Sequence, residues 1–122
     1  MDWDLSSDRP IYIQLMELFR RAVATGDCQP GQKVDAVRDL ASAASVNPNT
    51  MQRALLQLEQ EGLVYTKRTA GRFITEDRDK IEQLRKRLAE QAVIRFLDEM
   101  EHLGFYQADI ERMLAEANRQ RT

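Results

Sequence analysis

Residues 36–64 constrain the fold of this 122-residue chain more than any other segment. Their apolar residues recur at helical spacing and predict two helices joined by a tight turn, with polar residues at the tip of the second. Asn47 is suited to cap that second helix and Pro48 to occupy its first position. This arrangement indicates a helix-turn-helix, the motif that places its second helix in the major groove of DNA.

The composition is that of an ordinary globular protein. Hydrophobic residues make up 43% of the chain and charged residues 31%, which excludes wholesale disorder. No apolar run approaches the length of a membrane span. The first residues, Met1-Asp2-Trp3-Asp4-Leu5, are acidic and lack the basic start and apolar core of a signal peptide. The sequence therefore predicts a cytoplasmic protein without membrane contact.

A metal site and a disulfide are not expected. The chain has one cysteine, Cys28, and one histidine, His102, and these two residues alone cannot build a zinc site of the usual kind. We expect Cys28 to be a half-buried filler and His102 to pack or cap near a helix end. No cofactor is predicted.

The charge distribution predicts a small basic footprint. Residues 1–75 carry nine Lys or Arg and nine Asp or Glu, whereas residues 76–122 carry nine and eleven, which accounts for the net charge of −2. Within the first part, residues 64–75 contain three basic side chains and no acid. Such a footprint predicts modest affinity of a single copy for nucleic acid.

The first part of the chain predicts three helices. The first covers residues 10–25, with Asp8 as its N-cap and Gly26 as its stop. The second opens at Val34 with Asp35 as its cap. The third runs from the Asn47 cap to Gly62 and buries a stripe that contains Met51, Ala54, Leu55 and Leu58.

A hairpin follows these helices. Short strands are expected at residues 63–67 and 72–75, and Gly71 supplies conformational freedom to the turn between them. Helix, helix, helix, hairpin is the order of a winged helix-turn-helix domain. We therefore predict an α+β fold, mainly α, with this domain in residues 1–75.

Residues 76–122 predict a two-helix tail, with helices at about 77–103 and 105–119. Their apolar stripes form no core of their own, so a second copy of the chain is expected to cover them. The alternative is that the helices fold back on their own domain. The predicted dimer contacts are Ile81, Leu84, Leu88, Phe96, Leu97, Met100, Leu103, Ile110, Met113 and Leu114.

Motifs in residues 10–75 resemble the N-terminal domain of GntR-type transcription regulators. The short tail and the Asn-Pro-Asn-Thr turn resemble the YtrA subfamily. The motifs, in chain order, are Pro10-Ile11-Tyr12-Ile13-Gln14-Leu15, Gly26, Pro30-Gly31, Arg38-Asp39-Leu40-Ala41, Val46-Asn47-Pro48-Asn49-Thr50 and Leu58-Glu59-Gln60-Glu61-Gly62-Leu63-Val64.

The resemblance implies a dimeric repressor that binds a palindromic operator, in an operon that often encodes an ABC transporter. It also implies control by a small-molecule effector. The tail is too short to enclose a pocket of typical volume by itself, so an effector would need a crevice between subunits or between tail and winged domain. Three departures leave the operator sequence open: Val34-Asp35-Ala36 replaces Leu-Pro-Ser, Pro48 replaces Arg or Ser, and Thr69-Ala70-Gly71-Arg72 replaces Gly-x-Gly-Thr.

Candidate DNA contacts come from three places. The resemblance implies that Arg38, early in the second helix, reaches DNA, the alternative being an ion pair with Asp35 or Asp39. The first turns of the third helix and the hairpin tip carry amide, hydroxyl and basic side chains suited to base edges and phosphates. Asn47 has a competing role as a helix cap. The predicted contacts are Arg38, Asn47, Asn49, Thr50, Gln52, Arg53, Lys67, Arg68, Thr69, Gly71 and Arg72.

The aromatic residues Trp3, Tyr12 and Tyr65 are expected to pack rather than to stack on bases, because they are not interleaved with the basic tip. An enzyme is not expected, because the chain has no Ser-His-Asp elbow, glycine-rich phosphate loop or metal-ligand cluster. The remaining alternative is a winged-helix module that binds a protein without specific DNA binding.

Overall fold

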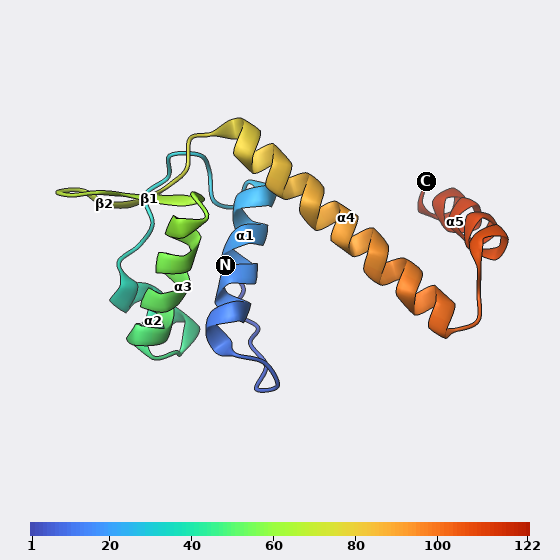
Figure 1. The fold of residues 1–122 in the computed structure, drawn as a ribbon, viewed down its shortest axis with the longest axis horizontal. Coiled ribbons are helices and arrows are strands. Elements are labelled where there is room, and N and C mark those ends of the chain that lie inside the picture. The colour runs from blue at the N-terminus through green and yellow to red at the C-terminus, as the bar shows by residue number, and fades with distance from the viewer. The chain divides into compact units, whose positions relative to one another are not determined.

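A computed structural model describes all residues, 1–122, and its contacts divide them into two compact units, Met1–Lys86 and Arg87–Thr122. The elements are α1 (Ile11–Thr25), α2 (Val37–Ala44), α3 (Pro48–Gln60), β1 (Val64–Lys67), β2 (Gly71–Ile74), α4 (Arg78–His102) and α5 (Gln107–Arg121) (Figure 1). This order confirms a mainly helical winged helix-turn-helix fold followed by two helices. None of the helices combines the length and the apolar character that crossing a membrane requires.

Helix α1 begins at Ile11, within one residue of the predicted start, but the predicted cap at Asp8 is wrong. Its N-cap is Pro10, whose ψ of 131° is extended, and Asp8 instead accepts a hydrogen bond from the Ser6 hydroxyl. Because a residue before proline is disfavoured in helical conformation, Arg9 cannot extend the helix backward to reach an Asp8 cap. The predicted stop is confirmed, since Gly26 adopts a left-handed φ of 85°.

Helix α2 begins at Val37 and not at Val34, and Asp35 does not cap it. The preceding residues instead lie along β2. The N–H of Val34 donates to the carbonyl of Arg72 at 2.9 Å, and the N–H of Ile74 donates to the carbonyl of Gln32 at 2.8 Å. These bonds hold residues 32–34 extended, so a third short segment pairs with β2. The spacing of apolar residues does not predict this segment.

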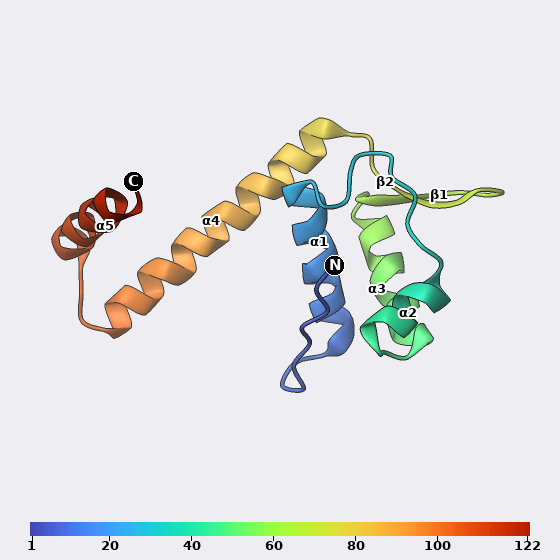
Figure 2. The same ribbon diagram turned by 180° about the vertical axis from the view of Figure 1, so that it is seen from behind.

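The turn and the helix after it agree with the sequence. Helix α3 begins at Pro48 with Asn47 as its cap, and its predicted stripe of Met51, Ala54, Leu55 and Leu58 is buried. Both views show α1 and α3 side by side (Figures 1 and 2). The core of the first unit therefore lies between these two helices.

Strands β1 and β2 pair antiparallel, with Val64 opposite Ile74 and Lys67 opposite Gly71. The turn between them is residues 68–70, and Gly71 has a φ of 104°, which only glycine adopts readily. The strand ends near α3 are buried and the opposite ends are exposed. The hairpin therefore presents its tip to solvent.

The tail helices lie where periodicity predicts them, within about two residues at each end. Gly104 has a φ of 88° and separates α4 from α5. Inside the second unit, Met100 and Ile110 are buried. The division between the units falls within α4, after Lys86, so residues 1–75, the predicted winged domain, all lie in the first unit.

Candidate nucleic-acid interface

The exposed face of α3 is a ridge opposite the buried stripe. Residues three or four apart lie on one side of a helix. This ridge, which we call the α3 ridge, consists of the exposed residues Asn49, Arg53, Leu56 and Gln60 and the half-buried Gln52. Leu56 is 43% exposed, which is unusual for a leucine in a helix that buries its other leucines. Leu56 is not among the predicted DNA contacts, although its spacing from Asn49, Gln52 and Arg53 places it on the same face. Thr50 is half-buried and lies beside the ridge.

Asn47 acts as a helix cap. Its Oδ1 accepts a hydrogen bond from the backbone N–H of Asn49 at 2.8 Å. This satisfies one of the free N–H groups at the start of α3. The side-chain oxygen of Asn47 is therefore engaged, and its NH2 group is the part left for another partner.

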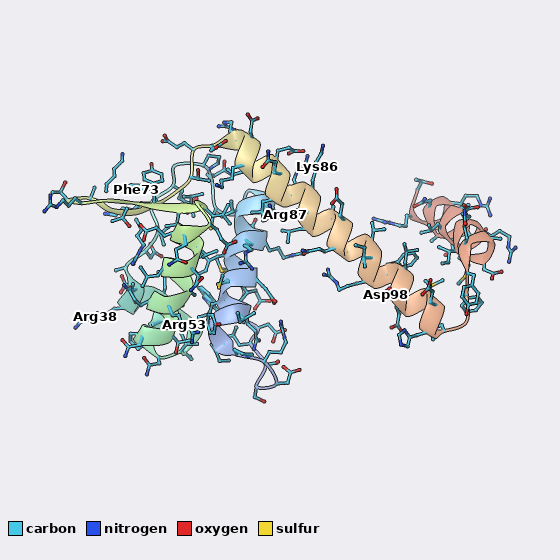
Figure 3. The ribbon with its side chains drawn as sticks, in the orientation of Figure 1. Arg38, Arg53, Phe73, Lys86, Arg87 and Asp98 are labelled. Carbon is cyan, nitrogen blue, oxygen red and sulfur yellow. The ribbon has the colours of Figure 1, made fainter.

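Arg38 is exposed on α2 and takes part in none of the five ion pairs of the chain. Figure 3 shows its side chain projecting away from the helix. Arg38 thus does not form the ion pair with Asp35 or Asp39 that was the alternative to a DNA contact. The guanidinium is free to meet an external acceptor.

Arg53 is held by an aromatic ring of α1. Its guanidinium carbon lies 3.6 Å from the centroid of the Tyr12 ring, a cation–π contact. Tyr12 therefore packs, as expected, but its partner is a predicted DNA contact. The other two aromatics also pack: Trp3 meets the edge of Phe19, and Tyr65 stacks on Phe73.

The hairpin tip carries the local basic cluster. The ammonium of Lys67 lies 5.0 Å from the centre of the Phe73 ring, while Arg68 and Thr69 are exposed in the turn. Arg72 differs from these because it is half-buried, and its Nε is buried without a hydrogen-bond partner. Lys67, Arg68 and Thr69 are therefore the accessible polar side chains of the tip.

Cys28 and His102 lie outside these surfaces and have the environments that the sequence suggests. Cys28 is half-buried, and burial raises the pKa of its thiol. His102 is exposed near the end of α4, with its Nδ1 3.0 Å from the carbonyl oxygen of Asp98. No group of three potential metal-binding side chains occurs in the chain.

The predicted dimer residues fall into three groups by exposure. Leu84, only 1% exposed, is buried within the first unit, and Met100 and Ile110 are buried within the second. Ile81 and Leu88 are half-buried. The exposed group is Phe96, Leu97, Leu103, Met113 and Leu114. Four further apolar side chains of the tail are exposed but are not among the predicted dimer contacts: Val93, Ile94, Phe105 and Tyr106.

The comparison with known proteins identifies the winged part. The family described as "Bacterial regulatory proteins, gntR family" matches residues 11–74, more than half of the chain. The chain is 34% identical over 104 residues to the uncharacterized HTH-type transcriptional regulator YhcF of Bacillus subtilis, covering 85% of this chain and 86% of that protein. It is 38% identical over 74 residues to the repressor YtrA of the same organism, covering 61% and 57%.

One solved structure matches nearly the whole chain and another matches its first part. A GntR family transcriptional regulator from Listeria monocytogenes superposes with a TM-score of 0.84 at 36% identity, covering 92% of this chain and 98% of that one. The DNA-binding domain of AraR in complex with operator ORR3 matches 62% of this chain and 93% of its own, with a TM-score of 0.52 and 26% identity. The chain belongs to the GntR family of bacterial transcription regulators and carries that family's DNA-binding helix-turn-helix domain.

Proposed function

We propose that this protein is a dimeric repressor that binds a palindromic operator through the α3 ridge and the hairpin tip. The observation that carries the proposal is the polar row of Asn49, Gln52 and Arg53 on a helix whose opposite face is the domain core; Asn49 and Arg53 are exposed and Gln52 is half-buried. Amide side chains can pair bidentately with adenine, and an arginine fork suits guanine or phosphate. The operator complex of AraR, which shares the fold, supports this use of the domain.

Flanking contacts set the position of the domain on the duplex. Arg38 on α2 and Lys67, Arg68 and Thr69 on the hairpin tip are exposed, so we assign them to phosphates or to the minor groove. Gly71 lets the hairpin backbone approach closely, and Thr50 beside the ridge meets a phosphate or a thymine methyl. Arg72 contributes less than Arg68, because part of its guanidinium is buried.

The tail helices provide the surface that binds a second copy of the chain. Phe96, Leu97 and Leu114 are exposed apolar side chains in the second unit, and covering them removes apolar area from water. A two-fold dimer presents two α3 ridges to successive major grooves, which requires an operator with matching two-fold symmetry. The relative YtrA is named a repressor, which supports repression. The resemblance to its subfamily supports an operon that encodes an ABC transporter as the target.

The test is selection of bound duplexes from a random pool with the full chain, followed by footprinting and sedimentation equilibrium. We expect a palindromic sequence whose half-sites lie about one helical turn, or a multiple of it, apart, and a dimer that protects both. Asn49→Ala is expected to relax base preference within each half-site, whereas the matched control Gln91→Ala on α4 leaves it unchanged.

A strictly monomeric chain that enriches no sequence would contradict the proposal. That outcome favours the alternative, a winged-helix module that binds another protein. A dimer that enriches a sequence without two-fold symmetry would refute the palindromic operator while leaving specific DNA binding in place.

A further inference from the structure

The stack of Arg53 on Tyr12 joins a predicted DNA contact to a residue of another helix. Arg53 lies in the second turn of α3, on the α3 ridge, and its side chain is exposed. Tyr12 is the second residue of α1 and is half-buried. The distance of 3.6 Å from guanidinium carbon to ring centroid is close contact for a cation over an aromatic face.

A second contact joins the same two helices about two turns further along the chain. The guanidinium of Arg20 binds the carboxylate of Glu61 through two hydrogen bonds, of 2.9 and 2.6 Å. Arg20 follows Tyr12 by about two helical turns, and Glu61 follows Arg53 by the same interval. Two contacts at matching spacing, one from Arg53 within α3 and one from its C-cap residue Glu61, connect α3 to α1. The Tyr12 ring is therefore carried on a rigid support rather than on a loop.

Arg53 has no competing acidic partner. None of the five ion pairs of the chain includes it. The stack covers the face of the planar guanidinium, but it leaves the N–H groups in its plane free for hydrogen bonds. A stacked guanidinium can thus still bind a phosphate with two parallel bonds.

We propose that Tyr12 is a positioning residue that holds the guanidinium of Arg53 for a DNA phosphate at the wall of the major groove. The inference rests on the proposed function and assigns a role to a residue of α1 that does not itself touch DNA. Arg53 occupies the side of the α3 ridge that faces α1. With α3 in the major groove, its head would then lie toward the edge of that groove. The ring restricts the rotamers of Arg53 before DNA arrives, and less entropy is lost when the phosphate contact forms.

A double-mutant cycle with the selected operator duplex tests this role. Tyr12→Leu is expected to weaken binding roughly threefold to tenfold, because the freed Arg53 side chain must then be ordered when the phosphate contact forms. The slope of log affinity against log salt stays unchanged, because Arg53 still reaches its phosphate. Arg53→Ala weakens binding further and makes the slope shallower by about one unit. The double variant binds as Arg53→Ala does, and Tyr12→Phe, which keeps the ring, binds as the wild type does.

Thermal unfolding, followed by circular dichroism, checks that each variant is folded. If Tyr12→Leu is unfolded, Tyr12→Met replaces it in the cycle, because methionine is a good helix former of similar bulk. Variants are compared only on folded protein, so a loss of stability is separated from a loss of positioning.

Three outcomes would overturn the inference while wild-type binding is intact. They are unchanged affinity of Tyr12→Leu, an equal loss from Tyr12→Leu in the Arg53→Ala background, and tighter binding of Tyr12→Leu. The last would mean that the ring keeps Arg53 away from DNA. Failure of the wild type to bind any duplex would reject the proposed function itself, and this role with it.

Discussion

The side chain of Asn47 and the backbone of Asn49 are joined by a hydrogen bond of 2.8 Å, so the residue that closes the turn after α2 also starts α3. The α3 ridge begins at the same Asn49. A change at Asn47 therefore acts first on the start of the helix and only through it on DNA.

Replacing Asn47 by alanine is expected to destabilise the protein by about 1 kcal/mol, the usual cost of losing a helix cap. Asn47→Asp and Asn47→Ser keep an acceptor at the same place and should retain most of the stability. Urea denaturation of the three variants measures the effect. Equal stability of Asn47→Ala and the wild type would show that the hydrogen bond contributes nothing net.

Ser45 is the one non-glycine residue with a positive φ, 56°, and it ends α2. Left-handed backbone is costly for residues with a Cβ, so Ser45→Gly is expected to stabilise the fold by about 0.5–1 kcal/mol. The matched control is Ser42→Gly inside α2, which should destabilise by about 0.5 kcal/mol, since glycine is the poorer helix former. Thermal melting distinguishes the signs, and two shifts in the same direction would refute the argument.

The hairpin tip predicts a salt-dependent contribution to binding. Arg68→Ala combined with Arg72→Ala should weaken all duplexes by similar factors, and the salt slope should fall by about one unit for each phosphate that the variant no longer neutralises. Because Arg72 is half-buried, Arg68→Ala alone is expected to account for most of the change. Arg121→Ala in α5 removes one positive charge from the tail, as Arg68→Ala does from the hairpin tip, and serves as the control for that single variant. An unchanged slope in the double variant would mean that the tip does not reach the backbone.

The exposed apolar residues of the tail predict where the dimer is sensitive. Phe96→Glu together with Leu97→Glu should raise the dimer dissociation constant by at least about 100-fold. Each change acts twice across a two-fold interface, and one buried side chain contributes about 1.5–3 kcal/mol. Gln91→Glu adds a similar charge at an exposed polar site of α4 and should leave the dimer intact. Sedimentation equilibrium measures both, and a dimer that survives the double change would place the interface elsewhere.

The partly buried thiol of Cys28 is expected to react slowly with alkylating reagents. Burial raises the pKa of Cys28, and only the deprotonated form reacts, so the folded protein should react with iodoacetamide several times more slowly at pH 7 than the urea-unfolded chain. The same pKa shift makes the free energy of unfolding depend on pH. Because the folded thiol holds its proton more tightly than the unfolded one, Cys28 favours the folded state at neutral pH, and this stabilisation is lost as the pH rises through the alkaline range. Mass spectrometry follows the alkylation, and equal rates in both states would contradict the assignment.

The beginning of α3 and its buried stripe could be predicted because both are encoded locally. A cap at Asn47, a proline at the first helical position and apolar residues at Met51, Leu55 and Leu58 are neighbours in sequence and in space. The beginning of α2 could not be predicted. The start of α2 depends on the pairing of residues 32–34 with β2, about forty positions further along the chain, and periodicity carries no signal for such a partner.

For the candidate interface, too, some properties could be predicted from the sequence and others could not. Residue types and spacing alone were enough to place Asn49, Gln52 and Arg53 on one helix face and a basic tip on the hairpin, because those features follow from helical and turn geometry. Only the tertiary structure decided that Arg53 rests on Tyr12, that Arg38 has no acidic partner, that Arg72 is partly buried and that Leu84 belongs to the core. These properties depend on which distant side chains the packed helices bring together, and packing across elements is not written in the pattern of any one of them.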